Sequence, residues 1–333
     1  MTHLPIRAFS GVQPTGRLHL GNYLGAIKPW VEHQHARENI FCVVDLHALT
    51  IPEVIRPDKL RANCRNVVAA FLASGIDPAV SSIFVQSHVR EHAELCWVLN
   101  CVTPLGWLDR MTQFKSKSEG RETIGAGLLD YPVLQAADIL LYDTDVVPVG
   151  EDQKQHIELA RDIAVRFNHL FGETLKVPAT SIPPTGARVM GLDEPTVKMS
   201  KSIAEQRPNH AIHLDQDLGK ARKAIMKAVT DAGCEYRPEQ ASPGVVNLMG
   251  ILSAVAGETV ESIAARFEGR GYGHLKTEVA DAVVGELTPV QAEYQRLLTD
   301  ADYLDGILTR STEHARGIAQ GVMSRVRAAV GIG

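Results

Sequence analysis

The sequence lacks any hydrophobic run long enough to cross a bilayer, and its first residues, MTHLPIRAFSG, lack the apolar core of a signal peptide. Cysteine is scarce as well: the five cysteines are odd in number, scattered, and include no C-x-x-C pair. A disulfide framework is therefore not expected, and a reducing compartment fits this pattern better than an oxidising one. These absences predict a cytoplasmic protein that is not associated with a membrane.

Basic charge is not in excess either. The chain has 34 Lys and Arg against 39 Asp and Glu, a formal net charge of −5, so a nucleic-acid partner would have to bind local basic patches. What the sequence does have is an ordinary globular composition, 45% hydrophobic and 22% charged, over 333 residues. That length predicts one large α/β domain with a smaller appendage.

Three short apolar runs predict strands of a parallel sheet, at residues 40–44, 83–85 and 146–149. Between the first two, apolar residues recur at helical spacing from Leu60 to Leu72, and Gly75 marks the expected end of that helix. A strand, a helix and a strand at this spacing form a right-handed crossover. Ligands bind such sheets beyond the carboxyl ends of the strands, where the sequence places Gln13, Asp45, His47, Gln86 and His88.

The pattern of the sequence changes beyond residue 205. Stretches such as LGKARKAIMKAVTDAG, GVVNLMGILSAVAG, ETVESIAARFEG and TEHARGIAQGVMSRVRAAVG are typical of helices separated by Gly and Pro. No strand-like run interrupts them. We therefore predict an α/β half followed by a helical half, with the boundary in SIAEQRPNH, residues 202–210.

The segment 16–22, GRLHLGN, has the glycine spacing of a phosphate-binding P-loop but lacks the residues that complete it. Asn22 and Tyr23 stand where Lys and Ser or Thr are required, so the groups that reach the terminal phosphates and hold Mg²⁺ are missing. A second segment, VKMSKS at residues 197–202, supplies two lysines and two hydroxyls. Flexible lysines suit a leaving pyrophosphate, although a solvated loop is the alternative for this segment taken alone.

Together, HLGN and KMSKS resemble the two signatures of class I aminoacyl-tRNA synthetases. Further segments in order resemble the bacterial tryptophanyl-tRNA synthetases: SGVQPTG, VVDLHALT, GIDP, MTQFKSKS, YPVLQAADILLY, VPVGEDQKQHIELARDIAVRFN, GARVM and FEGRGYGHLK. The resemblance implies a Rossmann-like catalytic domain over residues 1–205, a parallel sheet with helices on both faces. It also implies a helical anticodon-binding domain, 206–295, and a C-terminal helix, 296–333, that packs back on the catalytic domain.

The same resemblance implies an activity and partners. The protein would activate L-tryptophan with ATP to tryptophanyl-adenylate and transfer it to the 3′ end of tRNA(Trp), a reaction in which positioning and charge stabilisation dominate. Mg²⁺ would be held mainly by the ATP phosphates, because no acidic metal cage is visible. A homodimer is implied, in which one subunit reads the anticodon while the other activates the amino acid. GKARKAIMKAV and FEGRGYGHLK are candidate tRNA contacts, but a solvated helix face explains the first equally well.

The catalytic residues implied by the resemblance are His19, Asn22, Lys115, Lys198 and Lys201. His19 and Asn22 can donate hydrogen bonds to ATP oxygens without adding a permanent charge. Lys198 and Lys201 would close on the pyrophosphate, and Lys115 would reach the phosphates from a mobile loop, with a solvated basic loop as its alternative. The implied ATP-binding set is Gln13, Pro14, Thr15, Gly21, Asn22, Gly150, Glu151, Asp152, Val189, Lys198, Met199, Ser200, Lys201 and Ser202.

Amino-acid recognition is expected in YPVLQAADIL, where Pro132 is suited to begin a helix. Helical spacing puts Leu134, Asp138 and Leu141 on one face. A carboxylate among apolar neighbours is costly without a partner. The resemblance supplies one, the indole N–H of tryptophan, and a cap or a salt bridge is the alternative. The other implied tryptophan-binding residues are Phe9, His47, Tyr131, Val147, Val149 and Gln153.

Some features do not match the family pattern or a tempting motif. Gln135 stands where bacterial relatives usually carry Met, and it is left out of the binding set, while IAEQRP follows KMSKS where relatives often have an Asp. His88 to His92 spells the H-x-x-E-H signature of a zinc protease, but His88 falls at a strand end and the motif needs one helix. No metal site is predicted.

Two rival functions remain open at this point. One is a tyrosine-specific enzyme of the same plan. The other is a paralogue that keeps the fold and the pocket but acts as a binding or regulatory protein. The intact Lys198 and Lys201 argue against the second rival.

Overall fold

The computed structural model describes residues 6–118, 123–148, 153–181 and 188–333. Five parallel strands form one sheet: β1 (Arg7–Val12), β2 (Glu38–Val43), β3 (Ser81–Val85), β4 (Val146–Pro148) and β5 (Ala179–Ser181). Their order is β3-β2-β1-β4-β5. Winding therefore reverses between β1 and β4, which is where doubly wound sheets bind ligands. The three predicted strands are confirmed within the described residues.

Helices cover both faces of this sheet. Alternate residues of β2 point to opposite sides: Phe41 and Val43 join a core with α4 (Pro57–Ala73), whereas Ile40 and Cys42 face α5 (Glu91–Val102), α8 (Ala126–Leu140) and α9 (Lys154–Phe171). The predicted helix between the first two strand runs is confirmed as α4.

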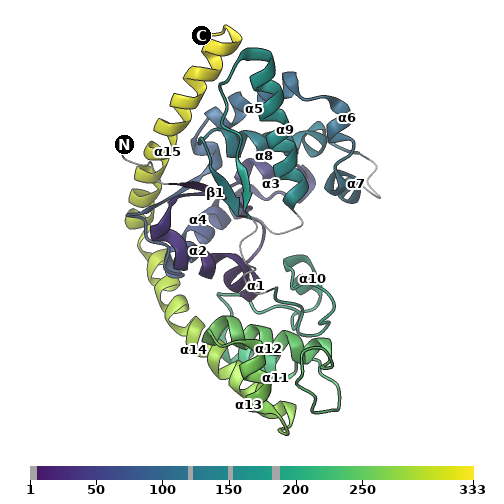
Figure 1. Ribbon diagram of the computed structural model, residues 1–333. Helices are drawn as coiled ribbons and strands as arrows, with labels where there is room; N and C mark the ends of the chain where they lie inside the picture. Colours follow the sequence, from purple (N-terminus) through teal and green to yellow (C-terminus); the bar gives the residue numbers. More distant parts are fainter. Residues whose placement is uncertain (1–5, 119–122, 149–152, 182–187) are drawn as a thin grey trace.

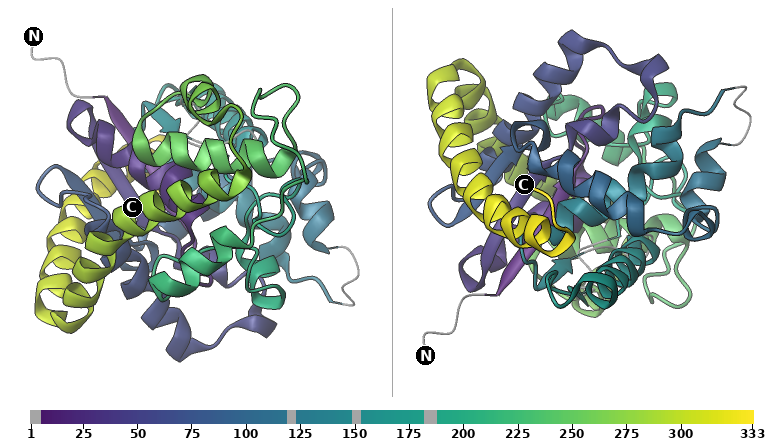
Figure 2. Two further views of the ribbon diagram at one scale, coloured as in Figure 1. Left: turned by 90° about the horizontal axis from the view of Figure 1, so that it is seen from below. Right: turned by 90° about the horizontal axis from the view of Figure 1, so that it is seen from above.

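The helical half gathers at one end of the elongated molecule (Figure 1). It contains α11 (Leu218–Met226), α12 (Pro243–Ala256), α13 (Val260–Phe267) and α14 (Tyr272–Thr299), and no strand occurs in residues 206–333. The last helix, α15 (Ala301–Val330), returns along the outside of the α/β half, as Figure 2 also shows, and its Ala319 and Met323 share a core with Phe84 of β3.

Short helical elements shape the loops around the sheet. They are α1 (Leu20–Asn22), η1 (Tyr23–Ile27), α2 (Lys28–His33), η2 (Gln34–Ala36), α3 (Asp45–Ala48), η3 (Pro52–Val54), η4 (Gln86–His88), α6 (Leu105–Leu108), α7 (Thr112–Ser118) and α10 (Lys201–Gln206). In the described ranges no single helix is long and apolar enough to span a bilayer. Only α12 and α13 pass that test jointly, and they are bent by 116°.

The expectation that Pro132 begins a helix is wrong. Helix α8 begins at Ala126, after the extended Gly125, and Pro132 lies inside it. Proline removes one N–H from the helix ladder, but the buried face of α8, with Leu128, Val133 and Ala136 fully or almost fully buried, keeps the helix continuous. Tertiary packing outweighs the local preference of proline here.

Candidate active site

A cavity of about 380 Å³ lies beyond the carboxyl ends of β1 and β4, a size typical of small-molecule pockets, which span roughly 300–1,000 Å³. Six of the seven residues expected to hold the amino acid line it: Phe9, His47, Tyr131, Asp138, Val147 and Gln153. The seventh, Val149, lies outside the described residues. The structure thus brings together side chains that are up to 144 positions apart in the sequence, from Phe9 to Gln153.

Asp138, in the last turn of α8, is a buried polar side chain of the wall with three hydrogen-bond partners. Its Oδ1 accepts hydrogen bonds from Gln86 Nε2 at 2.6 Å and His92 Nδ1 at 2.7 Å, and its Oδ2 lies 2.7 Å from His47 Nε2. The residue is 1% exposed. The partners that such a buried carboxylate needs are therefore supplied by the protein itself, by one glutamine and two histidines.

The charge state of Asp138 follows from these contacts. Burial by itself raises the pKa of a carboxyl group, but His47 and His92 lower it by their charge and hydrogen bonds, and the pKa of Asp138 ends below its ordinary value. Asp138 is thus held as a carboxylate. A carboxylate is a strong acceptor for an N–H donor in the cavity.

Among the residues of this site that the predicted binding sets do not contain are Gln135 and His92. Gln135 was excluded because of its departure from the family pattern, yet it lines the cavity, with its Nε2 at 3.5 Å from Gln153 Oε1. His92 belonged only to the dismissed zinc motif, whose His88 lies in η4 while His92 lies in α5. The signal for Gln86 was its position at the end of β3.

The HLGN segment forms the start of α1, and its two polar residues cap each other. The backbone N–H of Asn22 donates to His19 Nδ1 (3.3 Å), and the backbone N–H of His19 donates to Asn22 Oδ1 (3.1 Å). Because Nδ1 accepts, the proton of the neutral ring lies on Nε2, which can donate to a ligand. A Cβ at Gly21 would lie 3.1 Å from the His19 ring, so a side chain at this position would press on the ring.

The KMSKS segment lies directly beside HLGN. Lys201 Nζ donates to the Thr15 carbonyl at 2.7 Å, and Met199 packs near Gly21, 3.6 Å from where a Cβ would be. Burial first, and then the charge of Lys201, lowers the pKa of His19 to about 3, while burial lowers the pKa of Lys201 to about 8. His19 is therefore neutral near pH 7, next to a cation that titrates readily.

Residues 189–199 form a narrow hairpin, and the buried His210 contacts the backbone of the KMSKS segment. Met199 N–H donates to the Val189 carbonyl and Gly191 N–H to the Val197 carbonyl, at 3.1 and 2.8 Å. His210, 0% exposed, donates from Nδ1 to Asp193 Oδ1 at 2.6 Å, and its Nε2 lies 3.2 Å from the Lys198 carbonyl oxygen. Sequence reasoning missed His210, which carries no motif signal.

The other predicted ATP residues take varied positions. Gln13 lines the large cavity, Pro14 is buried, and Lys198 and Ser202 are exposed, as is Lys115 on α7. Ser200 stands at the N-cap position of α10. Gly150, Glu151 and Asp152 lie outside the described residues. Among the residues that the structure does describe, no group of three or more His, Cys, Asp or Glu could hold a metal ion.

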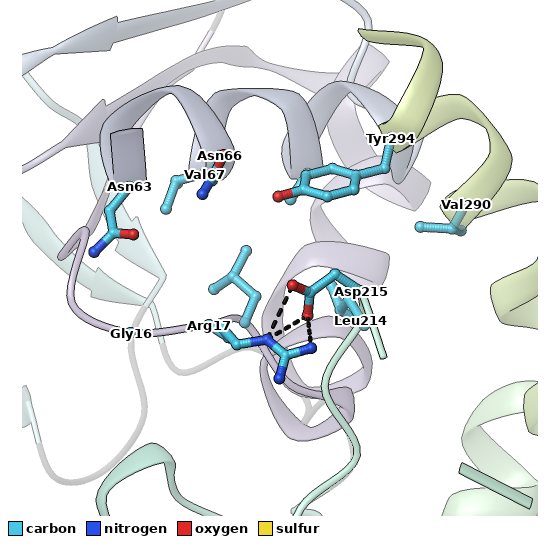
Figure 3. Close-up of a pocket in the computed structure, with 11 residues that line it drawn as sticks. Gly16, Arg17, Asn63, Asn66, Val67, Leu214, Asp215, Val290 and Tyr294 are labelled. Carbon is cyan, nitrogen blue, oxygen red and sulfur yellow. Dashed lines mark hydrogen bonds and ion pairs between the residues drawn. The ribbon is translucent and has the colours of Figure 1, made fainter. Parts of the chain in front are cut away.

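A second, much smaller cavity lies behind Gly16, between α4, α14 and residues 214–215 (Figure 3). Its edge carries the ion pair of Arg17 with Asp215, 2.7 Å between Nη2 and Oδ1. The volume is about 40 Å³, enough for a few water molecules at roughly 10–15 Å³ each. This cavity is therefore too small for a substrate, and the larger one is the candidate site.

Comparison with known proteins shows what this arrangement is similar to. Residues 1–288 match the family described as tRNA synthetases class I (W and Y). The tryptophan–tRNA ligase of Wolinella succinogenes is 50% identical over 329 residues, covering 98% of this chain and 98% of that protein. That of Thermosynechococcus vestitus is also 50% identical, covering 97% and 98%.

Solved structures give the same result. The tryptophanyl-tRNA synthetase of Mycoplasma pneumoniae superposes with a TM-score of 0.89 at 34% identity, covering 99% of both chains. The enzyme of Campylobacter jejuni complexed with ADP and tryptophan superposes with a TM-score of 0.83 at 36% identity, covering 98% of this chain and 100% of that chain.

Proposed function

The chain belongs to the class I tryptophanyl-tRNA synthetases, and on that premise we propose how its two polar sites divide the work. The activity is that of a tryptophan–tRNA ligase, which activates L-tryptophan with ATP and transfers it to tRNA(Trp). Tryptophan occupies the large cavity, with its indole N–H on Asp138. ATP lies between HLGN and KMSKS.

The observation that carries the amino-acid site is the arrangement around Asp138. A buried carboxylate faces a cavity walled by Phe9, Tyr131 and Val147, which suits a flat aromatic ring bearing one N–H donor. A site built to hydrogen-bond a polar group rejects analogues that lack it far more strongly than an apolar slot does. His47 and Gln153 belong to the same wall, and Val149 is assigned by resemblance alone.

In the activation step, a tryptophan carboxylate oxygen attacks the α-phosphorus of ATP in line, and pyrophosphate leaves. His19 Nε2 and the Asn22 amide donate to ATP oxygens, and the ammonium groups of Lys198, Lys201 and Lys115 stabilise the charge that builds on the pyrophosphate. The remaining ATP contacts are those implied by the resemblance, including Gly150, Glu151, Asp152 and Val189. No covalent intermediate with the protein is needed.

Mg²⁺ would be held mainly by the ATP phosphates. The imidazole, amide and ammonium groups of this site suit phosphate oxygens, whereas Mg²⁺ prefers carboxylate and water oxygens. In the transfer step the 2′-hydroxyl of the terminal ribose of the tRNA attacks the adenylate carbonyl and releases AMP. We place this work in the cytoplasm, because all five cysteines are free thiols.

We propose the division into a catalytic domain (1–205), an anticodon-binding domain (206–295) and a returning helix (296–333). Lys220, Lys223 and Lys227 of the α11 segment are exposed, while Ala221 and Ala224 are buried. The lysines thus share a solvent face that fits tRNA phosphates. Replacing Lys220 and Lys223 by Glu should lower tRNA charging but not tryptophan activation. If charging is unchanged, these lysines only face solvent and do not contact tRNA.

The homodimer is proposed to form through α5 and α6. Trp97 is 71% exposed and Leu105 is 70% exposed, and such apolar side chains in one stretch suit a second copy of the chain. Trp97→Asp should yield a monomer by light scattering. Val165→Asp, at a 56% exposed position of α9, is the matched control. If the Trp97→Asp variant is still a dimer, the interface lies elsewhere on the chain.

Tryptophan-dependent ATP–pyrophosphate exchange tests the proposed function as a whole. We expect exchange with tryptophan and none above background with tyrosine. Exchange supported by tyrosine would favour the tyrosine-specific rival. Exchange with neither amino acid, by folded protein, would favour a binding protein that has kept the fold.

A further inference from the structure

His92 is bonded to the carboxylate of the amino-acid site without being part of the cavity wall. Its Nδ1 lies 2.7 Å from Asp138 Oδ1, and Gln86 Nε2 lies 2.6 Å from the same oxygen. Both residues are 0% exposed, and neither lines the cavity. They hold Asp138 from the side that faces the core.

These contacts leave the two oxygens of Asp138 unequal. A carboxylate oxygen has two lone pairs, and both lone pairs of Oδ1 are used by Gln86 and His92. Within the described residues, Oδ2 has one partner, His47 Nε2 at 2.7 Å, and His47 itself lines the cavity. The carboxylate is therefore turned so that its remaining acceptor position lies on Oδ2, on the cavity side.

His92 is fixed in turn by Tyr142. The Tyr142 hydroxyl lies 2.7 Å from His92 Nε2. Both ring nitrogens of His92 therefore have a polar partner, Asp138 at Nδ1 and the Tyr142 hydroxyl at Nε2, and these two contacts fix the orientation of the ring. Tyr142 is 0% exposed and stacks on Phe9, with ring centroids 5.6 Å apart and planes 10° apart. This series of contacts runs from Asp138 to Phe9, and both of these residues line the cavity.

We propose that His92, oriented by Tyr142, is a positioning residue for amino-acid selection, which turns Asp138 so that only Oδ2 accepts the indole N–H. This inference rests on the proposed tryptophan site. Without His92, Oδ1 regains a lone pair, and the carboxylate can rotate about its side-chain bonds. The hydrogen bond to the substrate then loses its fixed geometry.

The test compares tryptophan with its benzothiophene analogue, in which sulfur replaces the indole N–H, by kcat/KM in ATP–pyrophosphate exchange. The variants are His92→Leu, His92→Asn, which keeps a donor near the position of Nδ1, and Tyr142→Phe. Phe84→Leu is the control. The ring centroids of Phe84 and His92 lie 6.1 Å apart in the same core, and Phe84 carries no polar group.

We expect His92→Leu to lower the preference for tryptophan over the analogue by about tenfold, the order of one hydrogen bond to a charged group. His92→Asn should keep most of that preference, Tyr142→Phe should fall between, and the KM for ATP should stay unchanged in all of them. If His92→Leu fails to fold, Tyr142→Phe and His92→Asn carry the comparison.

Two results would overturn the positioning role: an undiminished preference in the folded His92 and Tyr142 variants, or an equal loss in Phe84→Leu. A wild-type protein that does not prefer tryptophan over the analogue is a different outcome. It would contradict the proposed contact of Asp138 with the indole N–H, and the positioning role with it.

Discussion

Replacing Gly191 by alanine tests whether the KMSKS segment is held in place by His210. A Cβ at Gly191 would lie 2.2 Å from Cε1 and 2.4 Å from Nδ1 of the His210 ring. Ordinary carbon contacts begin near about 3.5 Å, so the ring has to move by roughly 1 Å or more. Gly191 is not among the glycines with positive φ, which makes the effect steric rather than a matter of backbone strain.

The magnitude follows from the contacts that the displaced ring loses. The His210–Asp193 hydrogen bond involves a charged group and is worth about 1.5–3 kcal/mol, and the longer contact with the Lys198 carbonyl about 0.5–1.5 kcal/mol. We expect the free energy of unfolding to fall by about 2–4 kcal/mol. Since misplacing a reacting group by about 1 Å costs on the order of 100-fold in rate, exchange should fall by about that factor.

Pyrophosphate exchange at saturating tryptophan, together with urea unfolding, measures both effects. Tryptophan affinity should not change, because neither Gly191 nor His210 lines the amino-acid cavity. Gly285→Ala is the matched control, an exposed position of α14 where a Cβ meets nothing within 4 Å. Wild-type exchange and wild-type stability in Gly191→Ala would refute the reasoning.

Three further outcomes follow from the site. Asp138→Asn should raise the KM for tryptophan by about 10- to 100-fold and leave the KM for ATP unchanged, because a charge-assisted hydrogen bond is lost; steady-state exchange measures both. As pH rises through about 8, Lys201 loses its proton, so kcat/KM for ATP should fall there, and Lys201→Arg should abolish that break in the pH profile. Lys115→Ala should slow exchange without changing the unfolding midpoint, since Lys115 is exposed.

The parts of the fold that sequence predicts well are those with one dominant physical cause. Residues 40–44 form a continuous apolar run because β2 is buried on both faces, and helical spacing from Leu60 to Leu72 appears because α4 buries one side. Pro132 shows the limit. Its local preference favours a helix start, but the packing of α8 depends on residues from α5 and α9 that no local pattern reveals.

The site was predictable as a set of residues but not as a network. The resemblance supplied Asp138 and His47, and strand ends supplied Gln86. The identity of the partners of Asp138 depends on contacts across 46 to 91 positions, and sequence spacing carries no information about such pairs. The motif that contains His92 indicated zinc binding rather than a contact with Asp138, and His210 belongs to no motif.

The HLGN segment, one half of the proposed ATP site, is also paired by backbone hydrogen bonds with the chain that follows KMSKS. Residues 212–214 pair with HLGN, since Leu20 N–H donates to the Ile212 carbonyl and Leu214 N–H to the Leu18 carbonyl, at 2.7 and 2.9 Å. Gln291 of α14 holds the same segment through the carbonyls of residues 214 and 216.

The other end of the KMSKS region is anchored in the helical half as well. Asn247 of α12 exchanges two hydrogen bonds with the backbone of Met190, at 2.9 and 3.0 Å. The segment that carries Lys198 and Lys201 therefore lies between two stretches of chain, Met190 and residues 214–216. Each of these stretches is held by a side chain of a helix beyond residue 205. If Lys198 and Lys201 act on the pyrophosphate as proposed, the helical half helps to position them, in addition to its proposed role with tRNA.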